Sequence, residues 1–197
     1  KAWSPATVMA LLTGLPTGNR YRRSPLAASR MYRLWSCDPT TTIPWLTVGD
    51  EVMRHARDLD DAERILGSHT PVGCWTYVIS DGHAREVLCW EENSERQRAI
   101  RVREEGTFGY ANVYLDEALG QSEVSLYGSY WRHNQGRHAR VNALLEERRG
   151  ALDPAGMASI LGDTGTGGCR IRDSIAMVMT VGSVVFRPED GTVWVGT

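Results

Sequence analysis

The sequence has no apolar run that approaches the roughly 20 residues a helix needs to cross a bilayer, and no signal-peptide pattern opens it. Its formal net charge is −2, which argues against a surface dedicated to nucleic acid. Hydrophobic residues make up 42 % and charged residues 23 % of the 197 residues, the profile of a soluble globular protein. We therefore expect one domain that binds neither a membrane nor nucleic acid.

Cysteine is scarce, and none of the four cysteines forms a CxxC pair, so the sequence predicts no zinc site, and we expect no cofactor. Cys74 and Cys89 lie in apolar, strand-like stretches, where a buried thiol behaves as a small hydrophobic group. We expect these two, together with Cys37 and Cys169, to be reduced. Reduced thiols favour a cytoplasmic location.

Strand and helix signals occur in separate runs. Aromatic and β-branched stretches bounded by turn residues predict strands over 73–80, 86–90, 99–102, 108–113, 174–180, 182–186 and 192–195. Cap residues and apolar periodicity predict helices over 5–13, 60–66, 131–149 and 153–162, and 43–58 has apolar residues at helical spacing. Strands that pair as hairpins, with helices apart from them, predict an α+β fold with mainly antiparallel sheet. The chain has no internal repeat and no low-complexity linker, which supports a single domain over 1–197.

Several short patterns then follow one another in a set order. A helix-like LDDAERIL is followed by a strand ending in Asp-Gly (YVISDG), by Ala111-Asn112, and by an arginine (Arg137 or Arg140) that precedes a Leu-Leu pair. Leu161-Gly162-Asp163, Cys169-Arg170, TVGSVV and VWV come last. Over roughly residues 43–197 this set resembles the acyl-CoA:isopenicillin N acyltransferase-like family of N-terminal-nucleophile (Ntn) hydrolases. The chain departs from that family's Thr-Asn-His at Val113.

The resemblance implies an Ntn-hydrolase-like αββα sandwich, in which two mainly antiparallel sheets are stacked. It also implies cleavage or transfer of an acyl group at the amide of a small N-acyl compound. The nucleophile in such an enzyme is an N-terminal Cys whose own α-amine acts as the base. Lys1 cannot take that role, so we expect the nucleophile on a missing or cleaved segment, for example on a companion chain produced by autoproteolysis.

Two residues are the candidate site. The resemblance gives Asn112 the role of oxyanion donor, since a side-chain amide can donate to the oxygen of a tetrahedral intermediate; the other interpretation is a turn or edge asparagine that bonds nearby backbone. It gives Arg170 the role of stabilising a thiolate or holding a substrate carboxylate. Alternatively, Arg170 is a surface arginine paired with Asp163 or Asp173.

Other constellations carry less weight. The TGTGG loop lacks the Gly-Lys-Ser/Thr ending of a phosphate loop. His133 and His138 are five residues apart rather than four, so we expect surface histidines and not a helical zinc pair. We expect Glu91, Glu92 and Glu95 to lie in a solvated loop.

The alternative to an enzyme is a non-catalytic, degenerate Ntn-fold protein that binds a small molecule or a partner chain. The two hypotheses differ in what precedes this chain. If the intact gene product has a Cys behind a removable propeptide, the enzyme is supported. If its first strand starts with no Cys, Ser or Thr, the binding protein is supported.

Overall fold

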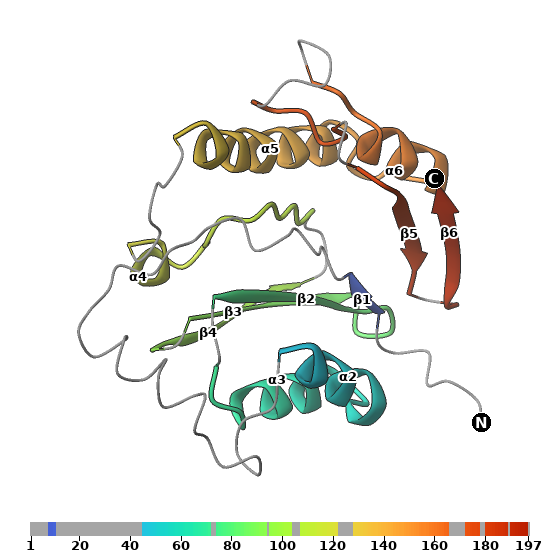
Figure 1. Ribbon diagram of the computed structural model, residues 1–197. Coiled ribbons are helices and arrows are strands. Elements are labelled where there is room, and N and C mark those ends of the chain that lie inside the picture. Colours follow the sequence, from blue (N-terminus) through green and yellow to red (C-terminus); the bar gives the residue numbers. More distant parts are fainter. Residues whose placement is uncertain are drawn as a thin grey trace.

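The computed structural model describes residues 8–10, 45–71, 74–93, 95–103, 107–121, 128–165, 172–177, 180–188 and 190–196. These residues form an α+β arrangement, as predicted (Figure 1). A four-stranded antiparallel sheet has the order β1-β2-β3-β4, with β1 at Val8–Ala10, β2 at Trp75–Asp81, β3 at Glu86–Glu92 and β4 at Gln97–Arg103. Helices α2 (Trp45–His55) and α3 (Leu59–Gly67) cover one face of this sheet.

The other face of the sheet is covered by an irregular segment, residues 107–116, which leads into the short helix α4 (Glu117–Gly120). Beyond this segment lies the long helix α5 (Gly128–Glu147), followed by α6 (Pro154–Leu161). An antiparallel hairpin of β5 (Ser183–Arg187) and β6 (Thr192–Gly196) lies beside α6. Within the described residues, the strands therefore belong to one four-stranded and one two-stranded sheet.

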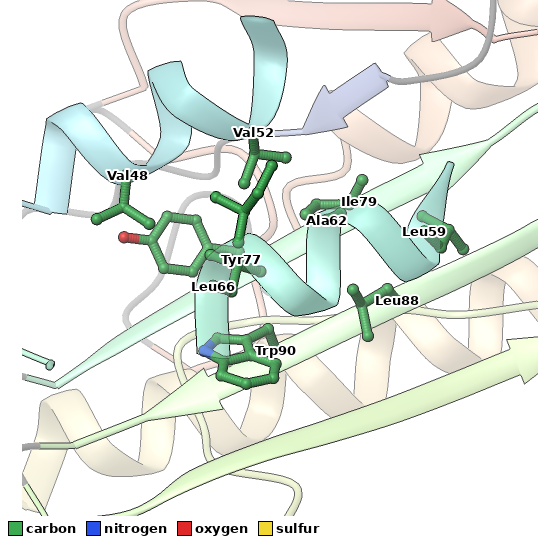
Figure 2. Close-up of a cluster of buried hydrophobic side chains, with 10 residues drawn as sticks. Val48, Val52, Leu59, Ala62, Leu66, Tyr77, Ile79, Leu88 and Trp90 are labelled. Carbon is green, nitrogen blue, oxygen red and sulfur yellow. The ribbon is translucent and has the colours of Figure 1, made fainter. Parts of the chain in front are cut away.

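The helix-covered face of the four-stranded sheet forms a dry core. Tyr77 and Ile79 from β2 and Leu88 and Trp90 from β3 lie on one face, because alternate residues of a strand point the same way (Figure 2). They pack against apolar residues of the two helices, namely Val48, Val52, Leu59, Ala62, Ile65 and Leu66. The helical contributions recur three and four residues apart, as one face of an amphipathic helix requires.

Helix α3 begins within one residue of its predicted start. The carboxylate of Asp58 accepts a hydrogen bond from the backbone N–H of Asp61 at 2.8 Å, so Asp58 is the N-cap. Asp60 and Asp61 lie in the first turn of the helix. There they still interact favourably with the helix dipole.

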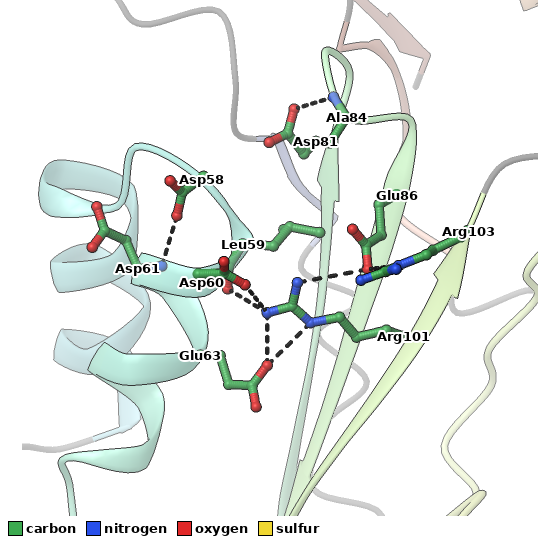
Figure 3. Close-up of polar contacts among 10 residues, drawn as sticks. All are labelled: Asp58, Leu59, Asp60, Asp61, Glu63, Asp81, Ala84, Glu86, Arg101 and Arg103. Carbon is green, nitrogen blue, oxygen red and sulfur yellow. Dashed lines mark hydrogen bonds and ion pairs between the residues drawn. The ribbon is translucent and has the colours of Figure 1, made fainter.

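A polar network at the edge of the dry core ties α3 to the sheet (Figure 3). Arg101 of β4 donates to Glu63 at 2.7 Å and to Asp60 at 2.7 Å, and its side chain is 21 % exposed. Arg101 also lies 3.6 Å from Glu86, which accepts a hydrogen bond from Arg103 at 3.0 Å. These contacts fix the position of α3 along the strands.

Three predicted elements are wrong in the described residues. Residues 8–10 form a strand and not part of a helix, because they pair with residues 78–80 at the edge of the sheet, a contact that local sequence does not reveal. Residues 108–113 form no strand. Residues 174–177 lie in turns and bends, where a strand over 174–180 was expected.

The remaining predicted elements are confirmed within a few residues. The Asp81 carboxylate accepts hydrogen bonds from the N–H groups of His83 and Ala84, which makes the predicted turn between β2 and β3. Gly150 has a φ of 75° just after α5, and Asp153 caps α6 through the N–H of Gly156. Within the described part of the chain, no helix combines the length and the apolar character that crossing a membrane demands.

Candidate functional site

The segment 107–116 is the most unusual part of the structure, because it is an irregular stretch held between the sheet and α5. Gly109, Ala111 and Val113 are buried, and the residues between them are partly exposed. This alternation explains why the sequence predicts a strand there. The segment is nevertheless no strand, since side chains take up many of its backbone hydrogen-bonding groups.

The sheet holds one end of this segment. Glu91 of β3, with 0 % exposure, accepts hydrogen bonds from the N–H groups of Leu115 at 2.7 Å and Asp116 at 2.9 Å. The hydroxyl of Tyr114 donates to the carbonyl of Glu92 at 2.8 Å. The hydroxyl of Tyr110 donates to the Thr76 hydroxyl at 2.7 Å. The prediction of a solvated loop is therefore wrong for Glu91 and Glu92.

Helix α5 holds the other end of the segment. The side-chain amide of Asn142 accepts from the N–H of Gly109 at 3.0 Å and donates to the carbonyl of Gly109 at 3.2 Å. A side chain at position 109 would not fit, because its Cβ would lie 2.7 Å from Val141 Cγ1. Glycine at this position therefore lets the segment approach the helix closely.

Asn112 lies at the middle of this segment and contacts α5 twice. Its Oδ1 accepts a hydrogen bond from Arg137 Nη2 at 2.7 Å, and its carbonyl accepts one from Asn134 Nδ2 at 3.2 Å. Arg137 Nη2 also donates to Asn134 Oδ1 at 3.0 Å, which closes a ring of hydrogen bonds among the three residues. The φ of Asn112 is 38°, a left-handed conformation that asparagine tolerates better than most residues. The expected position at the end of a strand is wrong; Asn112 sits in a strained turn instead.

The ring defines the orientation of the Asn112 amide. A guanidinium can only donate hydrogen bonds, so the oxygen of the amide must face Arg137 and the nitrogen must face away. No hydrogen bond among the described residues uses the Nδ2 group of Asn112. This group is therefore available to donate to a ligand.

Arg137 is a partly buried cation whose hydrogen bonds go to neutral acceptors, the side-chain oxygens of Asn112 and Asn134. Burial lowers the pKa of its guanidinium, although arginine stays protonated at physiological pH. Its Nε is buried without a hydrogen-bond partner, and no carboxylate among the described residues forms an ion pair with it. The positive charge next to Asn112 is consequently not neutralised within this part of the molecule.

His133 lies one turn before Arg137 on α5, and it is 2 % exposed. The expectation of a surface histidine is thus wrong. Its Nε2 contacts Met177 Sδ at 2.8 Å. Burial, and to a smaller extent the charge of Arg137, lowers the pKa of His133, while backbone near Arg172 and the charge of Asp173 act in the opposite direction. A lowered pKa keeps this imidazole neutral at pH 7.

Residues 172–174 pass close to the middle of α5. A Cβ at Gly136 would lie 2.1 Å from the carbonyl oxygen of Arg172, so only glycine allows this approach. Nearby, Asp163 accepts two hydrogen bonds from Arg140, at 2.9 Å and 2.8 Å, and one from the N–H of Gly165. The Arg140 hydrogen bonds in particular lower the pKa of Asp163. These contacts connect α5 with the loop that follows α6.

Arg170 and Cys169 lie outside the described residues. The structure thus brings the predicted Asn112 together with Arg137 and Asn134, and it leaves the role of Arg170 a prediction. Of the two arginines that the sequence pattern allowed, Arg137 contacts Asn112 and Arg140 binds Asp163.

The described residues also bear on two other kinds of site: an internal cysteine nucleophile and a metal site. Cys74 and Cys89 are both thiols, and Cys89 is fully buried. Burial raises the pKa of Cys89 to about 12, which makes it a poor nucleophile. Among the described residues, no three His, Cys, Asp or Glu side chains converge as metal ligands would.

Comparison with protein-family models, with curated proteins and with solved structures finds no match to this chain. The geometry around Asn112 and the order of the sequence patterns are therefore the features that bear on function.

Proposed function

We propose that the protein is an amide (C–N) hydrolase or acyltransferase that acts on a small N-acyl compound. The nucleophile would be an N-terminal Cys supplied from outside these 197 residues, either on a companion chain or on a segment cleaved by autoproteolysis. Asn112 would donate a hydrogen bond to the oxyanion. The αββα sandwich, with the β5–β6 hairpin as part of a second sheet stacked on the first, belongs to the same proposal.

One observation carries this proposal. Hydrogen bonds hold Asn112 at its side-chain oxygen and at its backbone carbonyl. Its Nδ2 group makes no hydrogen bond among the described residues. A donor that is fixed in advance and has no partner is what stabilisation of an oxyanion requires. An ordinary turn asparagine would bond neighbouring backbone with its own side chain. Asn112 instead receives its contacts from a helix more than twenty residues away in sequence.

The reaction would proceed in two steps. The thiolate of the N-terminal Cys attacks the amide carbon, its α-amine takes the thiol proton, and the carbonyl oxygen becomes an anion that Asn112 Nδ2 stabilises. Collapse of this intermediate breaks the C–N bond, and the amine leaves with the proton. Water or another acceptor then attacks the thioester and regenerates the thiol. One donor such as Asn112 contributes about 3 kcal/mol to lowering the barrier.

Arg170 would stabilise the thiolate or hold a carboxylate of the substrate, as the resemblance implies. A reducing compartment such as the cytoplasm suits a thiol nucleophile. The thiols at Cys74 and Cys89 are compatible with this location.

Hydrolysis of a panel of N-acyl substrates tests the proposal. We expect residues 1–197 alone to be inactive, and the same chain with the N-terminal-Cys segment, after verified processing, to release amine. Activity of the isolated chain that survives replacement of all four cysteines would show that the chemistry lies elsewhere. Inactivity of the complete, processed protein on the whole panel would favour the non-catalytic binding protein.

A further inference from the structure

We infer that Arg137 is a positioning residue that determines which way the Asn112 amide faces, so that Nδ2 and not Oδ1 is presented to the reacting carbonyl. This inference rests on the proposed function. It concerns a residue that touches neither substrate nor nucleophile and that acts only through Asn112.

The geometry supports this role because an asparagine amide has two orientations of nearly identical shape. Only the hydrogen-bond network decides between them. Arg137 Nη2, 2.7 Å from Oδ1, can donate but not accept, so a flipped amide would place N–H groups against a guanidinium. The flipped orientation would also present an oxygen to the developing oxyanion, which would repel it.

Asn134 also favours this orientation of the Asn112 amide. Its Oδ1 accepts from the same Nη2 of Arg137, and its Nδ2 donates to the carbonyl of Asn112. The orientation of the Asn134 amide is thereby fixed as well, and the backbone of Asn112 cannot rotate without breaking that bond. Both asparagines thus take their orientation from one guanidinium.

The charge of Arg137 adds a second effect. No described carboxylate forms an ion pair with this guanidinium, so no such pair offsets its field at the amide. A cation bound at the amide oxygen draws electron density from the nitrogen, which makes the Nδ2 hydrogens better donors. The strengthened donor is aimed away from the guanidinium, toward the side on which Asn112 has no partner.

A double-mutant cycle in the complete, processed protein tests the inference. The variants are Asn112→Ala, Arg137→Met and the double variant, assayed for kcat and KM on an N-acyl substrate that the wild type hydrolyses. We expect Asn112→Ala to lower kcat about 10²-fold and Arg137→Met to lower it about 10-fold or more with little change in KM. The double variant should match Asn112→Ala alone, because Arg137 acts only through that amide.

Arg140→Met is the matched control, since Arg140 lies on the same helix and its hydrogen bonds go to Asp163 instead. Its thermal stability should fall while kcat stays within about twofold of the wild type. Arg137→Lys covers the case in which Arg137→Met fails to fold, because it retains a charged donor; we expect it to keep more activity than Arg137→Met and to have no effect in the Asn112→Ala background.

Three results separate the possibilities. Multiplicative effects of Asn112→Ala with Arg137→Met, or with Arg137→Lys, would overturn the inference while the proposed function stands. So would an unchanged kcat in Arg137→Met when Asn112→Ala is impaired. An unchanged kcat in Asn112→Ala would instead remove the proposed role of Asn112, and the positioning role would fall with it.

Discussion

The two faces of the four-stranded sheet are built in opposite ways. One face, the dry face, packs Tyr77, Ile79, Leu88 and Trp90 against two helices, mainly through apolar contacts, although Trp90 Nε1 also donates to the Glu92 carboxylate. On the other face, Glu91 and Thr76 bind an irregular segment through polar side chains. The same strands carry both sets of residues, because side chains alternate along a strand.

This difference separates two tasks. Apolar packing stabilises the fold without requiring exact directions, since the hydrophobic effect is non-directional. Hydrogen bonds require defined distances and angles, so the polar face can fix the segment 107–116 in place for the contacts that Asn112 makes with α5. We therefore expect substitutions on the dry face to affect mainly stability, and substitutions on the polar face to affect geometry and activity.

The largest loss of stability should come from the dry face. Leu88 is fully buried between the sheet and the helices. Leu88→Ala should lower the free energy of unfolding by about 3 kcal/mol, because it removes buried methyl groups and leaves a cavity. Denaturant unfolding measures this. The milder Ile79→Val should cost about 1 kcal/mol, and equal losses for the two would argue against a well-packed core.

Removal of the Glu91 carboxylate should have the next largest effect. Glu91→Ala leaves the buried N–H groups of Leu115 and Asp116 without their acceptor, which should cost about 2 kcal/mol. Hydrogen exchange should also speed up across residues 107–116. Glu95, which is exposed in the turn before β4, is the control. If Glu95→Ala destabilises the protein as much as Glu91→Ala does, the Glu91 carboxylate does not anchor the segment 107–116 to the sheet.

The burial of His133 on α5 should also make stability depend on pH. The pKa of His133 is lowered in the folded state, chiefly by burial. As the pH falls, the unfolded chain therefore binds a proton at this histidine before the folded protein does. Stability is then fully present above about pH 6.5, the ordinary histidine pKa, and falls as pH drops toward the folded-state value. Thermal unfolding of His133→Asn should show a weaker dependence on pH between 7 and 5. His83→Asn, on the exposed turn after β2, should leave the dependence as it is.

The smallest effects should come from the ion pairs at the rim. Arg101 is mostly covered and binds both Asp60 and Glu63, whereas the Arg103 side chain is 75 % exposed and binds Glu86. We expect Arg101→Met to cost about 1 kcal/mol and Arg103→Met less than about 0.5 kcal/mol. A reversed order in chemical denaturation would mean that the network in Figure 3 does not hold α3 to the sheet.

The dry face could be predicted from the sequence, and the polar face could not. Strands over 75–81 and 86–92 and the helix at 59–67 have strong local signals, because apolar periodicity reflects burial directly. The segment 107–116 also alternates in burial, but its backbone partners are side chains distant in sequence. Local pattern cannot reveal such partners, so the segment was predicted to be a strand.

The same reasoning applies to single residues. Asn112 was found through the order of short patterns, whereas its contacts with Arg137 and Asn134 depend on how α5 packs on the segment. Glu91 and His133 looked like surface residues because charge and polarity usually indicate exposure. One signal did point to burial of Glu91: it directly follows the apolar run of residues 87–90 and continues the same strand.

The kcat of the complete, processed protein with Asn112→Ala tests the central claim most directly. That claim is that the segment between the polar face of the sheet and α5 carries an oxyanion donor, while the dry face provides only stability. We predict that kcat falls by about 10²-fold with a modest change in KM. The protein should also lose some stability, because alanine tolerates the positive φ of position 112 less well than asparagine does. Leu88→Ala, assayed below its melting temperature, should keep its kcat. An Asn112→Ala protein with full kcat and full stability would contradict the account and leave Asn112 an ordinary turn residue.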